Sequence, residues 1–303
     1  MTARQVSDFT LWETMQEAGL RLAASGWIPG RWFNSALPKQ SELTSAEGPI
    51  TLEIVSHCWK YSEFQLYQLS SLVNHAPKAM KVVHTVFYSE EDEDTVRLLD
   101  FFRPMEVENV TWNFQAMPKE ELFRRAIGRN RAAKATQADW IWFTDCDVVF
   151  HEGALDTLAT QLEGRQEYLV YPEQMLATDL LPKDDPLILE AKRHPRLMEL
   201  DLTRFSVRKF SRATGPIQIA HGDVARACGY CQDLKLYQKP MPRWSKCYED
   251  RAFRWLLGTQ GTPISVPNVL FIRHAEKGRY QQGSQISLLR KTIRRIKSAL
   301  IGR

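Results

Sequence analysis

The chain has 303 residues, of which 44% are hydrophobic and 25% charged, the mixture of an ordinary globular protein. This composition excludes a largely disordered chain, a collagen and a disulfide scaffold. The formal net charge of +4 is too small to indicate nucleic acid as a partner. Because no apolar run approaches the roughly 18 residues of a membrane-spanning helix and five cysteines suit a reducing compartment, we expect a cytoplasmic protein.

The N-terminal 48 residues form a segment of their own. Apolar residues from Leu11 to Leu22 recur at helical spacing, and glycines and a proline follow. We therefore expect three parts: an N-terminal helical extension (1–48), a main domain (49–280) and a C-terminal helix (281–303).

Strands and helices alternate through the main domain. In its first half the expected strands are 50–56, 81–88, 110–114 and 140–144, and the expected helices are 63–73, 95–102 and 120–136. In its second half the expected helices are 154–162, 221–228 and 249–257, and the expected strands are 168–171, 216–220, 264–266 and 269–272. Residues 172–214 have no clear pattern. The alternation predicts an α/β fold with a mostly parallel central sheet flanked by helices.

Two carboxylates, Asp145 and Asp147, directly follow the strand 140–144. Parallel sheets bind ligands at the carboxyl ends of their strands, so this position indicates a site. Hard cations such as Mg²⁺ and Mn²⁺ need carboxylate oxygens and share the phosphates of a ligand such as a sugar diphosphate. The alternative is that Asp145 caps a turn and Asp147 is a solvated loop residue.

A second acidic pair, Glu249 and Asp250, opens the helix 249–257. The helix dipole favours acids at this end, so capping alone explains the pair. One of the two carboxylates would otherwise serve as a general base.

Four further residues have a functional and an ordinary explanation. Arg129 and Arg131 would brace a diphosphate or form a solvated helix face. His274, just past a strand, would complete a metal site or be an ordinary hydrogen-bonded histidine. Trp244 would stack on an acceptor sugar, and packing explains it equally well.

Together these motifs resemble the GT-A glycosyltransferases, particularly the inverting family-2-like group. The resemblance covers about residues 50–274 and rests on the strand ITLEIVS, the blocks IGRNRAAKATQADWIWFTDCDVVF and YEDRAFRWLLGTQG, and His274. The arginine–asparagine pair, followed by small residues and an apolar strand into DxD, is its most specific part. The resemblance implies a GT-A (Rossmann-like) fold and a hexosyltransferase-type enzyme that uses a nucleotide-sugar donor, with a UDP-sugar as the commonest choice.

The resemblance also assigns roles to residues. Mn²⁺ or Mg²⁺ would be bound by Asp145, Asp147 and His274. Asp250 would deprotonate the acceptor hydroxyl, with Glu249 beside it. The donor would be surrounded by Ser56, His57, Trp59, Ser89, Glu90, Arg129, Asn130 and Asp145.

Two features depart from the family's usual pattern. The first strand ends in Ser56-His57-Cys58-Trp59 without the usual proline, and the absence of a QxxRW motif argues against a processive polysaccharide synthase. The implied acceptor is a glycan or a lipid-linked molecule.

Two alternatives to a glycosyltransferase stay open. A nucleotidyltransferase acting on sugar phosphates would normally show a glycine-rich loop, which residues 50–61 lack. The other is a non-catalytic, membrane-associated module that binds nucleotide sugars.

Basic residues are concentrated at the C-terminal end. Residues 271–303 carry nine Lys or Arg and one acid, a net +8, so the first 270 residues carry −4. Apolar residues recur at spacings of three and four: Ile286, Leu289, Ile293, Ile296 and Leu300. The pattern predicts a basic amphipathic helix. Residues 284–303 suit peripheral contact with the inner face of a membrane, and packing on the acidic body explains them equally well.

Overall fold

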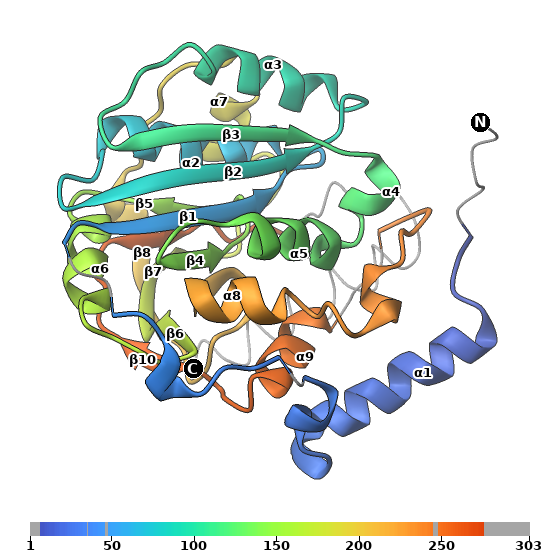
Figure 1. The fold of residues 1–303 in the computed structure, drawn as a ribbon. Helices are drawn as coiled ribbons and strands as arrows, with labels where there is room; N and C mark the ends of the chain where they lie inside the picture. The colour runs from blue at the N-terminus through green and yellow to red at the C-terminus, as the bar shows by residue number, and fades with distance from the viewer. Residues whose placement is uncertain (1–6, 35, 46–47, 245–247, 276–303) are drawn as a thin grey trace.

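The computed structural model describes residues 7–34, 36–45, 48–244 and 248–275, and its centre is a seven-stranded sheet between layers of helices (Figure 1). The strand order is β10 (Thr262–Ile264), β6 (Leu169–Pro172), β9 (Gln218–His221), β4 (Trp140–Phe143), β1 (Ile50–His57), β2 (Met80–Tyr88) and β3 (Val110–Ala116). Only β9 runs antiparallel to its neighbours, β4 and β6. The predicted mostly parallel sheet is therefore confirmed.

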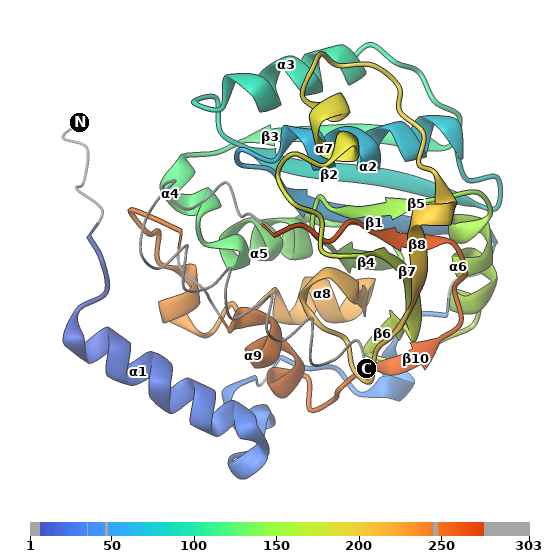
Figure 2. The same ribbon diagram turned by 180° about the vertical axis from the view of Figure 1, so that it is seen from behind.

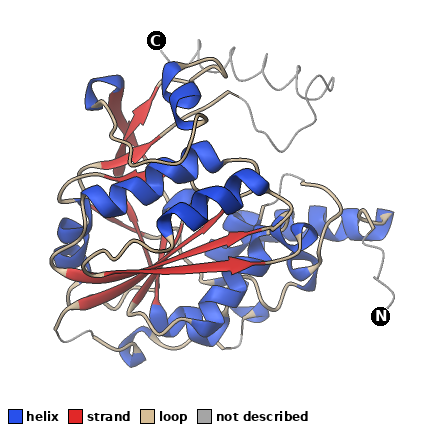
Figure 3. Cartoon of the chain, turned by 90° about the horizontal axis from the view of Figure 1, so that it is seen from above, coloured by secondary structure: helices blue, strands red, loops and turns tan. Residues whose placement is uncertain are grey.

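The central strands are apolar because helices cover both faces of the sheet. One face carries α2 (Ser62–Asn74) and α7 (Pro186–Ala191), and the other carries α5 (Arg125–Ala135) and α8 (Gly222–Cys228) (Figures 1 and 2). Viewed from above, helices lie on both sides of the strands (Figure 3). The remaining helices are α1 (Leu11–Leu22), α3 (Glu93–Phe102), α4 (Lys119–Leu122), α6 (Ala154–Leu162) and α9 (Glu249–Leu256).

A smaller sheet, which includes a strand from near the end of the main domain, lies against α2. Its order is β5 (Val148–Phe150), β11 (Val269–Phe271), β7 (Gln174–Thr178) and β8 (Phe205–Lys209). The strand β11 runs antiparallel to β5, and the amide of Ile272 donates to the carbonyl of Asp147 at 2.9 Å. This pairing sets the residues after β11 beside the loop after β4.

The expected helix 120–136 is wrong in one respect. It is two helices, α4 and α5, separated by Phe123 and Arg124. The backbone of Arg124 has φ −112° and ψ 86°, which is not helical, so a new helix begins at Arg125. The break places the N-terminus of α5 beside the loop that follows β4.

Two other expectations differ from the structure. Residues 172–214, which had no clear pattern, contain β7, α7 and β8. The strand expected at 264–266 lies at Thr262–Ile264, where it pairs in parallel with β6. The expected helix in the N-terminal segment is present as α1, which projects from the body (Figure 1). The expected C-terminal helix, residues 281–303, lies outside the described residues. Within the described ranges, no helix combines the length and hydropathy that crossing a bilayer requires.

Candidate active site

Three loops meet at one edge of the main sheet because the strands before them run in parallel and in register. Val55 of β1 pairs with Phe143 of β4, and His57 of β1 pairs with Phe87 of β2. The segments that follow these strands are 58–61, 89–92 and 144–147. Backbone contacts tie them together: the amide of Thr144 donates to the carbonyl of Val55 at 2.9 Å. Asp145 and Asp147 therefore lie where a parallel sheet offers a ligand site.

Asp147 and His274 face each other at this edge. Both are 5% exposed, and Nε2 of His274 lies 3.6 Å from Oδ2 of Asp147. The other carboxylate oxygen, Oδ1, is buried and accepts no hydrogen bond from the described residues. The ring of His274 stacks on Phe64 of α2 with centroids 4.2 Å apart, which fixes its orientation.

These two side chains fit a divalent cation. A buried carboxylate oxygen without a donor is costly, and a nitrogen 3.6 Å from the second oxygen is beyond hydrogen-bond distance. Carboxylate and imidazole are both suitable ligands of Mn²⁺. Asp145, the third expected ligand, has its carboxylate in an ion pair with Arg125 instead.

Arg125, at the start of α5, joins the two acidic motifs. Its guanidinium donates to Oδ1 of Asp145, and its Nε lies 3.4 Å from Oε1 of Glu249. Burial opposes the charge, but the carboxylates of Asp145 and Glu249 hold the pKa of Arg125 above its ordinary value. The arginine thus stays cationic between two loops that are distant in sequence.

Glu249 and Asp250 have different surroundings, although they are neighbours at the start of α9. The side chain of Glu249 is 2% exposed, and its Oε2 is buried with no hydrogen bond from the described residues. The side chain of Asp250 is 30% exposed and lies 3.6 Å from Nη1 of Arg254, one turn along the helix. Glu249 is therefore enclosed with Arg125, whereas the carboxylate of Asp250 is accessible to solvent.

Arg129 lies beneath the site, not in its opening. It is completely buried, and its guanidinium donates to the carbonyls of Thr144 and Gly215 and to the hydroxyl of Tyr230. One nitrogen also lies 3.5 Å from Asp145. These contacts support the loop after β4 from below.

Asn130, the neighbour of Arg129, has a similar supporting place. Its Oδ1 accepts from the amide of Tyr230 at 2.9 Å, which ties α5 to the loop after α8. The side chain of Arg131 is 45% exposed and pairs with Glu121 on the surface, 2.8 Å away.

Two neighbouring cavities open at this edge. The smaller has a volume of about 20 Å³ and is lined by ten residues, among them Trp59, Asp145, Asp147 and Trp244. The larger has a volume of about 880 Å³, and His274 is part of its lining. Trp59 and Tyr61 line both cavities, so the Asp147–His274 pair lies where the two meet.

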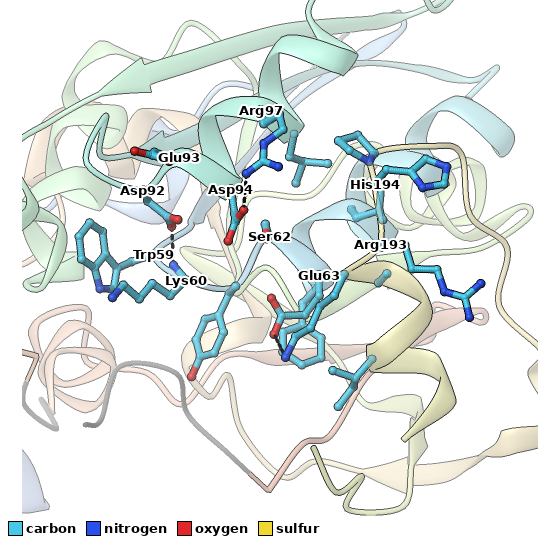
Figure 4. Close-up of a pocket in the computed structure, with 18 of the residues that line it drawn as sticks. Trp59, Lys60, Ser62, Glu63, Asp92, Glu93, Asp94, Arg97, Arg193 and His194 are labelled. Carbon is cyan, nitrogen blue, oxygen red and sulfur yellow. Dashed lines mark hydrogen bonds and ion pairs between the residues drawn. The ribbon is translucent and has the colours of Figure 1, made fainter. Parts of the chain in front are cut away.

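The larger cavity lies between the starts of α2 and α3 and a wall formed by 191–195 (Figure 4). Its rim is charged. The backbone amide of Lys60 donates to the carboxylate of Asp92, which holds the loops after β1 and β2 together (Figure 4). Arg193 and His194 extend from the opposite wall.

The remaining expected donor residues are distributed around these loops. Ser56 is fully buried, and its hydroxyl donates to Gln65 at 3.2 Å. His57 lines the smaller cavity beside Gly128 of α5, where a Cβ would lie 2.2 Å from its Nε2. Ser89 is buried in the turn after β2, and Glu90 is exposed. Trp59 lines the smaller cavity as well, together with Trp244, the residue expected to contact the acceptor.

Cys146, between the two aspartates, is a buried free thiol. Hydrogen bonding with Cys58, together with burial, raises the pKa of Cys146 well above its ordinary value. It therefore stays protonated and fills space between the loops after β1 and β4.

Sequence reasoning missed Arg125, which holds the two motifs together, and Phe123, which packs edge-on against Trp59 at 5.4 Å. The double arginine at 124–125 was a signal that the expectation of one continuous helix obscured. Lys60 and Asp92, which connect two loops of the larger cavity, were also missed.

Comparison with known proteins finds a family model that matches part of the chain. Residues 92–200 match the family model described as glycosyl transferase family 2, a segment that includes Asp145 and Asp147. Among solved structures, the crystal structure of S. aureus TarS 1–349 is 13% identical with a TM-score of 0.44, and the match covers 75% of this chain and 61% of that chain. No curated protein matches. The family match covers about a third of the chain, so this segment is similar to glycosyl transferases of family 2, and the mostly parallel sheet agrees with the α/β fold class predicted from the sequence.

Proposed function

We propose that this protein transfers a hexosyl group, with inversion, from a nucleoside diphosphate sugar to a hydroxyl of a glycan or lipid-linked acceptor. The observation that carries the proposal is the ion-pair chain Asp145–Arg125–Glu249, which brings the two acidic motifs to one edge of the sheet. Arg125 thereby holds the loop 144–147, which would bind the donor, beside the start of α9, which would carry the general base.

The larger cavity suits the nucleoside half of the donor. Its volume of about 880 Å³ lies in the range of about 300–1,000 Å³ that small-molecule sites occupy. Trp59 offers an aromatic face for a base, and the loops after β1 and β2 form one wall. The diphosphate would then reach the junction of the two cavities, where Asp147 and His274 lie. UDP is the nucleotide with which we would begin.

Asp147 and His274 would hold the divalent cation, with Asp145 beside them. When bound, Mn²⁺ or Mg²⁺ supplies positive charge that offsets the charge growing on the departing diphosphate. Arg125 adds a second fixed positive charge from the protein itself, since it stays cationic between its carboxylates. Buried groups held in place in this way need no rearrangement as the charge develops.

Asp250 is the general base of this proposal. Its accessible carboxylate takes the proton of the acceptor hydroxyl while the oxygen attacks the anomeric carbon from the face opposite the diphosphate. Glu249 positions Arg125 and is too enclosed to meet an acceptor. Trp244, in the lining of the smaller cavity, would contact the acceptor sugar.

Donor hydrolysis tests the proposal. The full chain would be incubated with a panel of nucleotide sugars, with and without Mn²⁺, and the release of nucleoside diphosphate would be measured. We expect slow, Mn²⁺-dependent release from one donor. Absence of release and of any metal-dependent nucleotide binding across the panel would contradict the proposal. Release of pyrophosphate from a nucleoside triphosphate and a sugar phosphate would identify a nucleotidyltransferase instead.

A further inference from the structure

A second cluster of metal-binding side chains lies away from the proposed catalytic site. His75, His151 and Glu199 each offer one ligand atom, and these atoms all lie within 4.8 Å of one another. Nε2 of His75 lies 3.5 Å from Oε2 of Glu199, and the rings of His75 and His151 are 4.3 Å apart. Three chain segments therefore converge here: the end of α2, the end of β5 and the loop before β8.

Hydrogen bonds from α2 fix the backbone next to both distant ligands. The hydroxyl of Ser71 accepts from the amide of Phe150, the neighbour of His151, at 3.2 Å. Met198, the neighbour of Glu199, is held by two bonds of 3.0 Å: its amide donates to the hydroxyl of Ser70, and its carbonyl accepts from Asn74. The positions of all three candidate ligands thus depend on one helix.

The cluster also contains an unsatisfied nitrogen. Nδ1 of His151 is buried and has no hydrogen-bond partner among the described residues. A buried polar atom without a partner is costly, and a metal bond would satisfy one of the imidazole nitrogens. Glu199, whose side chain is 62% exposed, is free to move the short distance that coordination requires.

We propose that His75, His151 and Glu199 bind a Zn²⁺ ion with a fourth position open to water. Two imidazoles and one carboxylate are ligands that Zn²⁺ prefers in tetrahedral sites, with bonds of about 2.0–2.2 Å. The site is separate from the Asp147–His274 pair: β5 leads from Asp147 to His151, and α2 leads from the donor side to His75. The ion would anchor the loop that continues the cavity wall of Arg193 and His194.

Zn²⁺ binding to variants of the full chain tests this site independently of glycosyl transfer. Protein stripped with a chelator is titrated with Zn²⁺ alone, in an Asp147→Asn background that weakens the catalytic site. We expect one remaining Zn²⁺ per chain and a rise in melting temperature. Adding His151→Gln is expected to weaken binding at least about a hundredfold and to remove the rise in melting temperature, since a direct ligand matters at least as much as the outer-shell groups that cost 10–100-fold.

His194→Gln in the same background is the matched control, because His194 is exposed on the same loop and lies outside the cluster. It should leave binding unchanged. Should the Asp147→Asn protein fail to fold, Co²⁺ binding is measured without that substitution. The wild type is expected to show a tetrahedral Co²⁺ spectrum, and this spectrum is expected to vanish in His75→Gln. Zn²⁺ binding that survives His151→Gln, or a Co²⁺ spectrum that survives His75→Gln, overturns the proposal.

Discussion

Asp145 and Glu249 share one arginine, although they lie far apart in the sequence. Arg125 donates to the first and lies 3.4 Å from the second, and only a small part of its side chain is exposed. The pair connects the loop after the central strand β4 to the first turn of α9. This relationship makes one site of two motifs that each had an ordinary explanation.

Arg125→Gln should be destabilising and inactivating. The substitution leaves Glu249 buried without its cationic partner, and breaking such a pair typically costs about 3–5 kcal/mol. We expect a fall of this size in the free energy of unfolding by denaturant, and at least about a hundredfold slower donor cleavage, of the order seen when one charge-stabilising donor is removed. Arg131→Gln is the control: its exposed ion pair with Glu121 should contribute at most about 1 kcal/mol. Equal effects of the two substitutions would refute the special role of Arg125.

Asp147→Asn should reduce the affinity for Mn²⁺ without unfolding the protein. The change keeps the size of the side chain but removes the charge of the buried carboxylate whose Oδ1 accepts no hydrogen bond from the described residues. We expect the Mn²⁺ concentration for half-maximal donor cleavage to rise about tenfold or more, since a direct ligand matters at least as much as the outer-shell groups whose loss costs about 10–100-fold. Asp100→Asn, an exposed change on α3, should leave it unaltered. An unchanged Mn²⁺ requirement in Asp147→Asn would exclude this residue as a ligand.

Two glycine substitutions in helices should have opposite effects. A Cβ at Gly128 of α5 would lie 2.2 Å from Nε2 of His57 and 2.9 Å from the ring of Phe87, so Gly128→Ala should cost about 1–3 kcal/mol. At Gly19 of α1 nothing lies within 4 Å, and alanine should gain about 0.5–1 kcal/mol. Thermal unfolding of both variants measures the difference. A neutral Gly128→Ala would show that α5 is able to move away from β1.

The stability of the protein should decline in acid partly because of His84. This side chain on β2 is completely buried, and burial lowers its pKa from 6.5 to about 3. Between these two values the unfolded chain binds a proton that the folded chain does not, so stability should fall as pH drops below 6.5, by roughly 1.4 kcal/mol per pH unit. His84→Gln should show a shallower slope from pH 6.5 to 5, and His194→Gln, an exposed change, should not. Identical slopes for His84→Gln and the wild type would mean that His84 does not account for this decline.

The sequence was sufficient for the elements whose signals are local. Buried strands such as β1 and β4 have apolar runs between turn residues, and their alternation with helices predicted the parallel sheet. Asp145 and Asp147 were recognisable as candidate site residues because they follow such a strand. The fold class could therefore be predicted from pattern alone.

Features that depend on tertiary contacts could not be predicted in this way. The helix break before Arg125 accompanies the burial of Arg124, whose guanidinium lies 4.9 Å from the ring centre of Phe9. Arg129 resembled a phosphate ligand, but its hydrogen bonds to Gly215 and Tyr230 enclose it beneath the loop. An arginine on a helix has the same sequence signal whether it binds a phosphate or supports a loop from below, so only the fold distinguishes the two roles.

The most direct test of the proposed mechanism is Asp250→Asn. The variant keeps the side-chain size at an accessible position and leaves Arg125, Asp147 and His274 in place. We expect donor binding with Mn²⁺, measured calorimetrically, to stay within about threefold of the wild type, while transfer to the acceptor falls by about 10²–10⁴-fold, the usual contribution of a general base. Transfer at the wild-type rate in Asp250→Asn would contradict the assignment of Asp250 as the general base.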